Sequence, residues 1–411
     1  MAALLVYRRR MSIPAAECIA LEDRFGAHNY HPLPVVISKG EGAWVTDVDG
    51  GRYLDFLSAY SALNFGHSHP ALVEVAKKQL DRLTLTSRAF HNDLLGLFCK
   101  ELAELVGLDR VLPMNSGAEA VESAIKVSRA YGYRVRDIPN GQAQIVVAGG
   151  NFHGRTTTII SFSDDEVAKA DFGPYTPGFV TVPYGDIDAM RQALAQPNVV
   201  GFLVEPVQGE AGVVVPPVGY LQAARDACTA SGALLIADEI QSGLGRTGTT
   251  LACEHEGVTP DVLLLGKALG GGIVPLSAVV THDEVLGVLR PGEHGSTFGG
   301  NPFAVAIGRE VIAMLRTGEF QRASTQLGAH LHQRLHHEAP GTVERVQGIG
   351  LWAGIVLKES AGPARARCEQ LLSLGLLAKE THETTVRLAP PLMISQQDLD
   401  YGIDLVLQAL A

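Results

Sequence analysis

The sequence predicts an α/β fold built on a mostly parallel sheet, and two observations carry this prediction. Between about residues 110 and 290, short apolar runs alternate with stretches of helical periodicity, which is the pattern of successive βα units. Several of these runs are almost continuous Val, Ile and Leu, as in strands that are buried on both faces of a parallel sheet. Apolar residues make up 46% of the 411 residues and charged residues 19%, so the chain can bury a large core.

The strands expected in this sheet are the runs 144–148, 179–182, 199–204, 233–237, 262–265 and 277–280. Residues 219–231 are predicted to form a crossover helix, and the crossovers are expected to be mostly right-handed. The first hundred residues are typical of an arm with a few strands and helices, and the last hundred of a smaller α+β unit. We therefore predict an N-terminal arm and part of the small domain at 1–60, a large domain at 61–300 and the rest of the small domain at 301–411.

Composition excludes several classes of function. Lys and Arg number 33 against 44 Asp and Glu, a net charge of −11 that argues against nucleic acid or an anionic membrane as partner. No apolar run approaches the roughly 18 residues of a membrane-spanning helix. Five cysteines without a Cys-x-x-Cys pair indicate reduced thiols rather than disulfides or a zinc site. In residues 1–10 the apolar stretch precedes the basic one, the reverse of a secretory signal, so we expect a tail or an upstream start and a cytoplasmic location.

Two ionisable side chains directly follow predicted strands, where open α/β sheets bind their ligands. Asp238 ends the run that begins at residue 233. It is either a loop or cap acid, or a carboxylate that holds a proton on a heteroaromatic nitrogen. Lys267 follows the run 262–265 and precedes three glycines. It is either a solvated loop lysine, or a desolvated amine that can form a Schiff base and act as a base.

A third candidate is the segment Ser116-Gly117-Ala118-Glu119, which precedes a helical pattern. Ser-x-x-Glu is a capping box, and the same place is a natural phosphate cradle because backbone N–H groups are free there. A phosphate anchor, an acid for a ring nitrogen and a strand-end lysine together are what pyridoxal 5′-phosphate requires. Phe152, after the run 144–148, is either a core aromatic or a stacking partner for the pyridine ring.

Two other patterns favour different chemistry and are weaker. Gly243, Gly245 and Gly248 match the G-x-G-x-x-G pattern of a dinucleotide oxidoreductase, but residues 238–242 separate them from the preceding strand, where that fingerprint needs its first glycine. His332 and His336 have the spacing of a shared helix face, but no carboxylate or cysteine is placed to complete a metal site. We therefore expect no metal.

The residues around Lys267, Asp238 and Gln241, together with Gly-Ser-Thr-Phe-Gly-Gly-Asn-Pro at 295–302, resemble the class III pyridoxal-phosphate aminotransferases. Within that family the chain is similar to the ornithine branch from about residue 25 to the C-terminus. The segments that carry this likeness are 29–34, 83–90, 204–212 and 292–297. The resemblance implies fold type I, with a seven-stranded, mostly parallel sheet in a large cofactor-binding domain and a smaller α+β domain.

The resemblance also implies a role for each cofactor residue. Lys267 would be the Schiff-base lysine and proton shuttle, Asp238 would pair with the pyridinium nitrogen, and Gln241 would bind the phenolic oxygen. The remaining cofactor-binding residues would be Ser116, Gly117 and Ala118 at the phosphate, Phe152 on the ring, His153 beside it and Thr297. In this family Thr297 reaches the phosphate of the neighbouring subunit, which implies a homodimer with shared active sites and leaves assembly into a higher oligomer open.

On the substrate side, Arg155 and Arg387 would bind carboxylates, and Tyr30 and Tyr60 would line the pocket. Glu210 would pair with Arg387 for the diamino acid and release it for the dicarboxylate. The implied reaction transfers the δ-amino group of L-ornithine to 2-oxoglutarate, in proline biosynthesis or arginine catabolism.

Several alternatives stay open at this point. N-acetylornithine, lysine or 4-aminobutyrate are other possible donors for an enzyme of the same class. An aminomutase or a racemase would use the same scaffold without a keto-acid co-substrate, and a cofactor-free binding protein would use it without catalysis.

Overall fold

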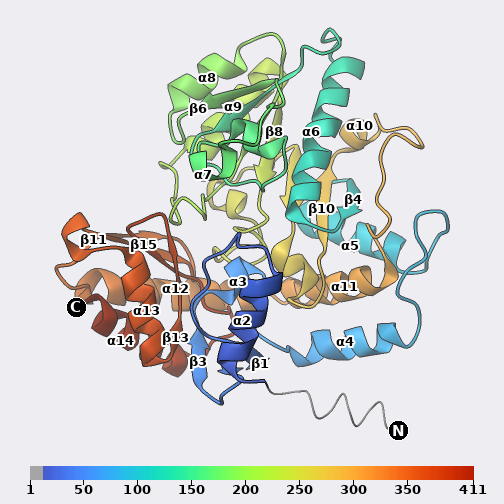
Figure 1. The fold of residues 1–411 in the computed structure, drawn as a ribbon. Helices are drawn as coiled ribbons and strands as arrows, with labels where there is room; N and C mark the ends of the chain where they lie inside the picture. Colours follow the sequence, from blue (N-terminus) through green and yellow to red (C-terminus); the bar gives the residue numbers. More distant parts are fainter. Residues whose placement is uncertain (1–12) are drawn as a thin grey trace.

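The computed structural model describes residues 13–411, and the predicted tail at 1–10 lies outside the described residues (Figure 1). Its centre is a seven-stranded sheet with the order β4-β10-β9-β8-β7-β5-β6. The strands are β4 (Arg110–Met114), β5 (Gln144–Ala148), β6 (Phe179–Val182), β7 (Val199–Val204), β8 (Leu234–Asp238), β9 (Val262–Leu265) and β10 (Ser277–Thr281). β10 is antiparallel to both of its neighbours, and the other pairs are parallel. The predicted α/β class and mostly parallel sheet are confirmed.

All six predicted strands form, with ends that differ from the prediction by at most one residue. The seventh strand, β4, was missed because it begins with an exposed Arg110 and contains Pro113. A proline cannot donate to a sheet ladder, so it is tolerated in a strand such as β4 that lies at the edge and pairs on one side only.

Helices cover both faces of this sheet because successive strand residues point to opposite sides. Alternate residues of β7 show it: Phe202 packs with one cluster and Leu203 with the other. One cluster includes the face of α6 (Gly117–Arg134). On the opposite face, the cluster contains residues of five further helices: α4 (Pro70–Leu80), α5 (Leu95–Val106), α8 (Ile187–Leu194), α9 (Tyr220–Ser231) and α11 (Pro302–Arg316). The predicted crossover helix at 219–231 is α9.

A second core joins the two ends of the chain. Its antiparallel sheet, in the order β11-β12-β15-β14, consists of β11 (Val343–Gly348), β12 (Ala353–Leu357), β14 (Lys379–Thr381) and β15 (Thr385–Leu388). The helices that pack with it are α12 (Glu319–Glu338), α13 (Ala364–Leu374) and α14 (Gln396–Leu410). N-terminal residues Ala43, Leu54 and Phe56 are buried in the same cluster.

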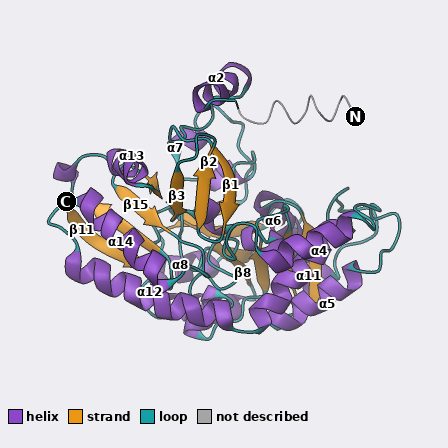
Figure 2. Cartoon of the chain, turned by 90° about the horizontal axis from the view of Figure 1, so that it is seen from below, coloured by secondary structure: helices purple, strands orange, loops and turns teal. Residues whose placement is uncertain are grey.

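The N-terminal sheet lies beside this core. It comprises β1 (Ile37–Glu41), β2 (Trp44–Asp47), β3 (Arg52–Asp55) and, parallel to β3, β13 (Leu376–Leu377). The helix α2 (Ala15–Phe25) buries none of its residues and stands away from the body of the molecule (Figure 2). The domain limits remain predictions; because α11 packs on α4 and α5 in the large core, we propose that the C-terminal boundary follows Arg316.

The shorter elements occupy the connections. They are α3 (Ser58–Ser61), α7 (Glu166–Lys169), α10 (Asp283–Leu286), η1 (Ile159–Phe162), η2 (Ala252–Glu256), η3 (Lys267–Gly270) and η4 (Glu359–Ala361). Over the part of the chain that the structure describes, none of the helices has the length and apolarity to cross a bilayer.

Candidate active site

A cavity of about 200 Å³ opens beyond the carboxyl ends of the large sheet. It is lined by Gly117, Ala118, Phe152, His153, Gly154, Glu205, Val207, Asp238, Ile240, Gln241 and Lys267. These residues come from the start of α6 and from the segments that follow β5, β7, β8 and β9. The structure therefore places seven of the nine predicted cofactor residues in the lining of one cavity.

Lys267 is held in an unusual backbone conformation. It begins η3 with a φ of +44°, in the left-handed region that residues other than glycine rarely adopt. Such strain costs about 1–3 kcal/mol and is concentrated at functional sites. Burial is the largest influence on the amine and lowers its pKa, while the charges of Glu210 and Asp238 act in the opposite direction. An amine of lowered pKa is more readily neutral, as a nucleophile or base needs to be.

Asp238 ends β8 and is fixed by two hydrogen bonds. Its Oδ2 accepts from Nδ1 of His153 at 2.7 Å, and its Oδ1 accepts from the backbone N–H of Ile240 at 3.0 Å. His153 is fully enclosed, and among the described residues its Nε2 has no hydrogen-bond partner. Burial lowers the pKa of this imidazole, but the hydrogen bond and charge of Asp238 together with the charge of Glu205 outweigh burial, so the pKa is raised.

Glu205 is a buried carboxyl that sequence reasoning did not select as a site residue. It directly follows β7, and its Oε2 accepts from the backbone N–H of Phe152 at 2.9 Å. Burial raises its pKa to about 7, with His153 acting against the shift and Asp238 in favour of it. The signal that could have found it is the one that found Asp238, namely a carboxylate at the end of an apolar strand.

At the start of α6 the structure confirms the capping box, and the phosphate cradle stays a prediction. Ser116 forms the capping box with Glu119, whose backbone N–H donates to Ser116 Oγ at 3.2 Å. Gly117 and Ala118 line the cavity, and the first N–H groups of a helix have no partner within it. A Cβ at position 117 would lie 3.1 Å from the Ile240 side chain, so glycine keeps this wall open. The cap orders the turn and leaves its amides for an anion.

Next to Gln241 of the cavity wall, buried Arg387 and partly buried Glu210 form an ion pair. Arg387 Nη1 donates to Glu210 Oε1 at 2.7 Å, and Gln241 Nε2 donates to the same oxygen at 3.3 Å. Burial opposes ionisation of Glu210, but Arg387 and then Lys267 outweigh it, so the pKa of Glu210 is lowered. Arg387 is 3% exposed, and among the described atoms its Nε has no partner.

Tyr60 lies over Arg387, with the guanidinium carbon 5.0 Å from the ring centre. The tyrosine sits in a turn, Ser58–Ser61, in which all four residues have φ values between +47° and +70°. Four successive left-handed residues other than glycine form a strained turn. This turn conformation places the Tyr60 ring against Arg387. Burial is the main cause of a raised pKa at Tyr60.

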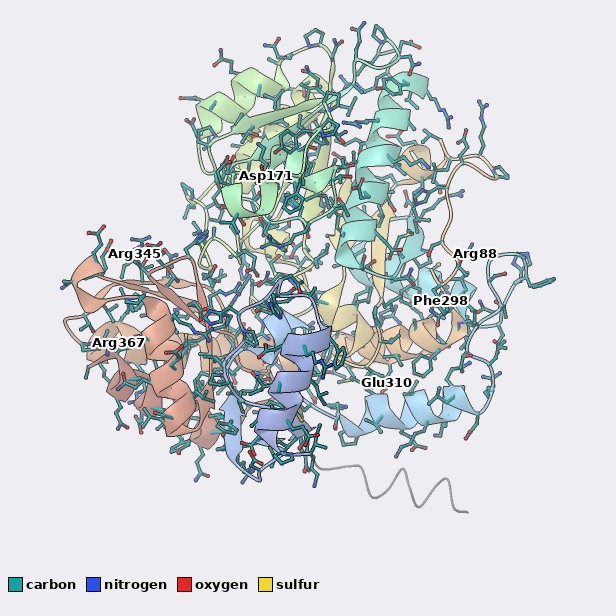
Figure 3. All side chains as sticks on the ribbon, in the orientation of Figure 1. Arg88, Asp171, Phe298, Glu310, Arg345 and Arg367 are labelled. Atoms are coloured by element: carbon teal, nitrogen blue, oxygen red, sulfur yellow. The ribbon has the colours of Figure 1, made fainter. Side chains whose placement is uncertain are left out.

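The other predicted residues lie outside this cavity. Tyr30 is 78% exposed, Ser116 and Thr297 are exposed, and Arg155 lies 5.7 Å from the centre of the Phe152 ring. Thr297 is followed in the sequence by Phe298, an exposed side chain that is labelled in Figure 3. Ser116 borders a neighbouring hollow of about 400 Å³ that shares Gly117 and Lys267 with the cavity.

The glycine pattern at 243–248 is accounted for by packing. The glycines of 243–248 carry Arg246, which is fully buried and donates to Asn64 Oδ1 and to the carbonyls of Leu351 and Pro390. That loop is a structural junction between the two cores. Within residues 13–411, no three His, Cys, Asp or Glu side chains are grouped so that they could hold a metal ion.

The chain is similar to known proteins along nearly its whole length. The family described as class-III aminotransferases matches residues 25–410. The ornithine aminotransferase of Brevibacillus brevis is 51% identical over 388 residues, which cover 94% of this chain and 96% of the relative. A solved ornithine aminotransferase from Toxoplasma gondii, with pyridoxal phosphate at partial occupancy, gives a TM-score of 0.96 at 41% identity over 99% of this chain and 97% of that one. An acetylornithine aminotransferase from Elizabethkingia anophelis gives 0.88 at 45% identity, covering 96% and 98%.

Proposed function

The chain belongs to the class-III aminotransferases, and from that premise we propose that it transfers the δ-amino group of L-ornithine to 2-oxoglutarate. The products are glutamate and glutamate 5-semialdehyde, which can close on its own amine to pyrroline-5-carboxylate. The observation that carries the choice of substrate is the ion pair of Glu210 and Arg387. An enzyme that accepts an ω-amine first and glutamate second has to hide a carboxylate-binding arginine in only one of the two half-reactions.

Enzymes of this class depend on pyridoxal phosphate, and the residues of the cavity fit it. The fit rests on the donors present: free amides at the start of α6, an aspartate backed by a histidine, and a lysine of lowered pKa around one space. Gly117 and Ala118 would hold the phosphate, Asp238 the ring nitrogen, Gln241 the phenolic oxygen and Phe152 the ring face. When bound, the cofactor supplies the covalent tether for the amino group and an electron sink.

Lys267 Nζ holds and moves the proton in this scheme. With its pKa lowered by burial, the neutral amine accepts a proton from the carbon that carries the transferred amino group and later returns it. Asp238 supplies negative charge at the end of β8, and the His153 hydrogen bond keeps its carboxylate oriented.

Glu210 and Arg387 account for the two substrates. While the pair is closed at 2.7 Å, Arg387 offers no free charge, and ornithine binds with its α-carboxylate at Arg155 and its α-amino group at Tyr30. Glutamate brings a second carboxylate, which takes the place of Glu210 on the guanidinium. In this exchange Arg387 stays in place, because it belongs to β15, and the Glu210 side chain rotates away from it.

N-acetylornithine is the second candidate donor, because a solved structure 45% identical to this chain is an acetylornithine aminotransferase. A single half-reaction separates the two. The purified protein is mixed with L-ornithine without a keto acid, and the loss of the cofactor's absorbance is followed beside samples with N-acetylornithine, lysine and 4-aminobutyrate. We expect fast conversion with ornithine alone. Faster conversion with N-acetylornithine would keep the class and change the substrate.

We further propose that the enzyme works in the cytoplasm, in proline biosynthesis or arginine catabolism, as a homodimer with shared active sites. Exposed apolar side chains at Phe90, Leu97 and Phe298 support a subunit interface. Thr297 lies next to Phe298, outside the cavity of its own chain, as expected of a residue that serves the neighbouring site. Sedimentation of the holoenzyme tests the dimer.

A further inference from the structure

The segment that carries Tyr30 is hydrogen-bonded to the small domain through one side chain, and its Leu33 packs against the core of that domain. Residues 27–34 contain neither helix nor strand. Arg365, on α13, donates through Nη1 to the carbonyl of His31 and through Nη2 to the carbonyl of Pro32, both at 2.9 Å. Within residues 13–411, no other hydrogen bond joins 27–34 to the small domain.

The same guanidinium is tied to the substrate end of the site. Its Nη1 also lies 3.4 Å from Glu380 Oε1, and Glu380 is in β14, the strand that pairs with β15 and Arg387. After burial, the influences on the pKa of Tyr60 include the charges of Arg387, Glu210, Tyr30 and Glu380, so each of these groups lies within electrostatic reach of Tyr60. Arg365 therefore joins the Tyr30 segment to the strands that present Arg387.

The geometry calls for arginine in particular. Two nitrogens of one planar group bind two successive carbonyls while Nε binds Glu369 Oε1 at 2.8 Å. The side chain is 18% exposed, which sets it apart from the solvated ion pairs of the surface. A lysine has one nitrogen on a flexible stem and cannot hold both carbonyls in fixed register.

We propose that Arg365 is a positioning residue for amino-donor selectivity, acting by fixing the main chain beside Tyr30. The inference rests on the proposed function, in which Tyr30 binds the free α-amino group of ornithine. The glutamate half-reaction uses Arg387 and has no group for Tyr30 to bind. Loss of the Arg365 contacts therefore weakens the ornithine half-reaction and spares the glutamate half-reaction.

The test compares R365Q and R365K with R367Q, a control on the same helix whose contacts are to Ala361, Gln370 and Ala409 (Figure 3). For R365Q we expect kcat/KM of the ornithine half-reaction to fall about tenfold, mainly through KM, with glutamate changed less than about twofold. R365K retains the charge, and its kcat/KM for the ornithine half-reaction is expected to fall nearly as much as that of R365Q. R367Q is expected to match the parent in both half-reactions. Equal losses in both half-reactions for R365Q and R365K would overturn the proposal.

A double-mutant comparison with Y30F separates this proposal from the proposed function. If Arg365 acts through Tyr30, adding R365Q to Y30F lowers kcat/KM of the ornithine half-reaction by less than about a further twofold. Full additivity beside an ornithine-selective loss in Y30F overturns the role of Arg365 alone. A Y30F variant that loses nothing selectively overturns the assignment of Tyr30 itself.

Limited proteolysis gives a readout without substrate. Chymotrypsin cleaves after aromatic residues, and it is expected to cut after Tyr30 faster in R365Q than in R367Q. Equal rates of cleavage would contradict the attachment.

Discussion

The floor of the cavity and its entrance are held in place by different kinds of structure. At the floor, Asp238 and Lys267 follow adjacent strands of one sheet, so backbone hydrogen bonds fix their spacing. At the entrance, Tyr60 on a strained turn meets Arg387 on a strand of the small domain through a side-chain contact. Tyr30 lies on the arm that the Arg365 side chain binds. In the proposed function, the chemistry is therefore built into the sheet, while selectivity depends on contacts between distant segments. One solved structure that shares the fold at 45% identity is named for a different substrate, acetylornithine.

Among changes at the floor, removal of the Lys267 side chain is expected to have the largest effect on turnover. Lys267→Ala is expected to lower turnover by about 10⁴-fold or more, because the site loses both its tether and its base. Formation of glutamate from ornithine and 2-oxoglutarate measures it, with exposed Lys358→Ala as the control. Turnover retained by Lys267→Ala would remove the whole assignment.

Neutralising Asp238 weakens the floor without changing its shape. Asp238→Asn keeps the size of the side chain and is expected to lower kcat about 10³-fold by removing a preorganised charge. Circular dichroism should show an unchanged fold, and Asp226→Asn on the outer surface of α9 is the matched control. A loss of less than about tenfold in kcat would show that this charge is not needed.

Glu205 provides a test of the floor that needs neither cofactor nor substrate. Its pKa is about 7 in the native protein against an ordinary 4.5, so the native state holds a proton that the unfolded chain releases above pH 4.5. This contribution to the free energy of unfolding is fully present below pH 4.5 and is lost as the pH rises through 7. Glu205→Gln removes the titration, and its stability relative to the parent is expected to be about 2 kcal/mol better at pH 8 than at pH 5.

Urea unfolding of the cofactor-free protein at the two pH values measures this difference, with the exposed Glu359→Gln as control. Parallel pH profiles for Glu205→Gln and the parent would contradict the raised pKa.

Breaking the ion pair at the entrance has a smaller, selective effect. Glu210→Ala leaves Arg387 unmasked, which favours α-amino acids that carry a carboxylate beside the reacting carbon. The ratio of the glutamate to the ornithine half-reaction rate is expected to rise about tenfold. Single-turnover absorbance changes measure both rates, and Glu344→Ala, on the exposed side of β11, is the control. An unchanged ratio would show that Glu210 does not act as the mask.

Much of the large domain could be predicted from the sequence because its signal is local. Runs of Val, Ile and Leu mark strands buried on both faces, and six of them were found with their ends nearly correct. The residues after those runs then identified Asp238 and Lys267. β4 escaped because Arg110 and Pro113 interrupt the apolar run at an edge position. Glu205 escaped although the same strand-end signal was present.

By itself the sequence determined the α/β class, the sheet and the residues at its carboxyl ends, because these follow from which side chains are apolar and in what order. Only the tertiary structure decided which distant groups meet. The bond from His153 to Asp238 spans 85 positions, and that from Arg365 to His31 spans 334. Contacts at such separations leave no periodic trace in the sequence, since they depend on how two cores pack rather than on the preference of any one segment.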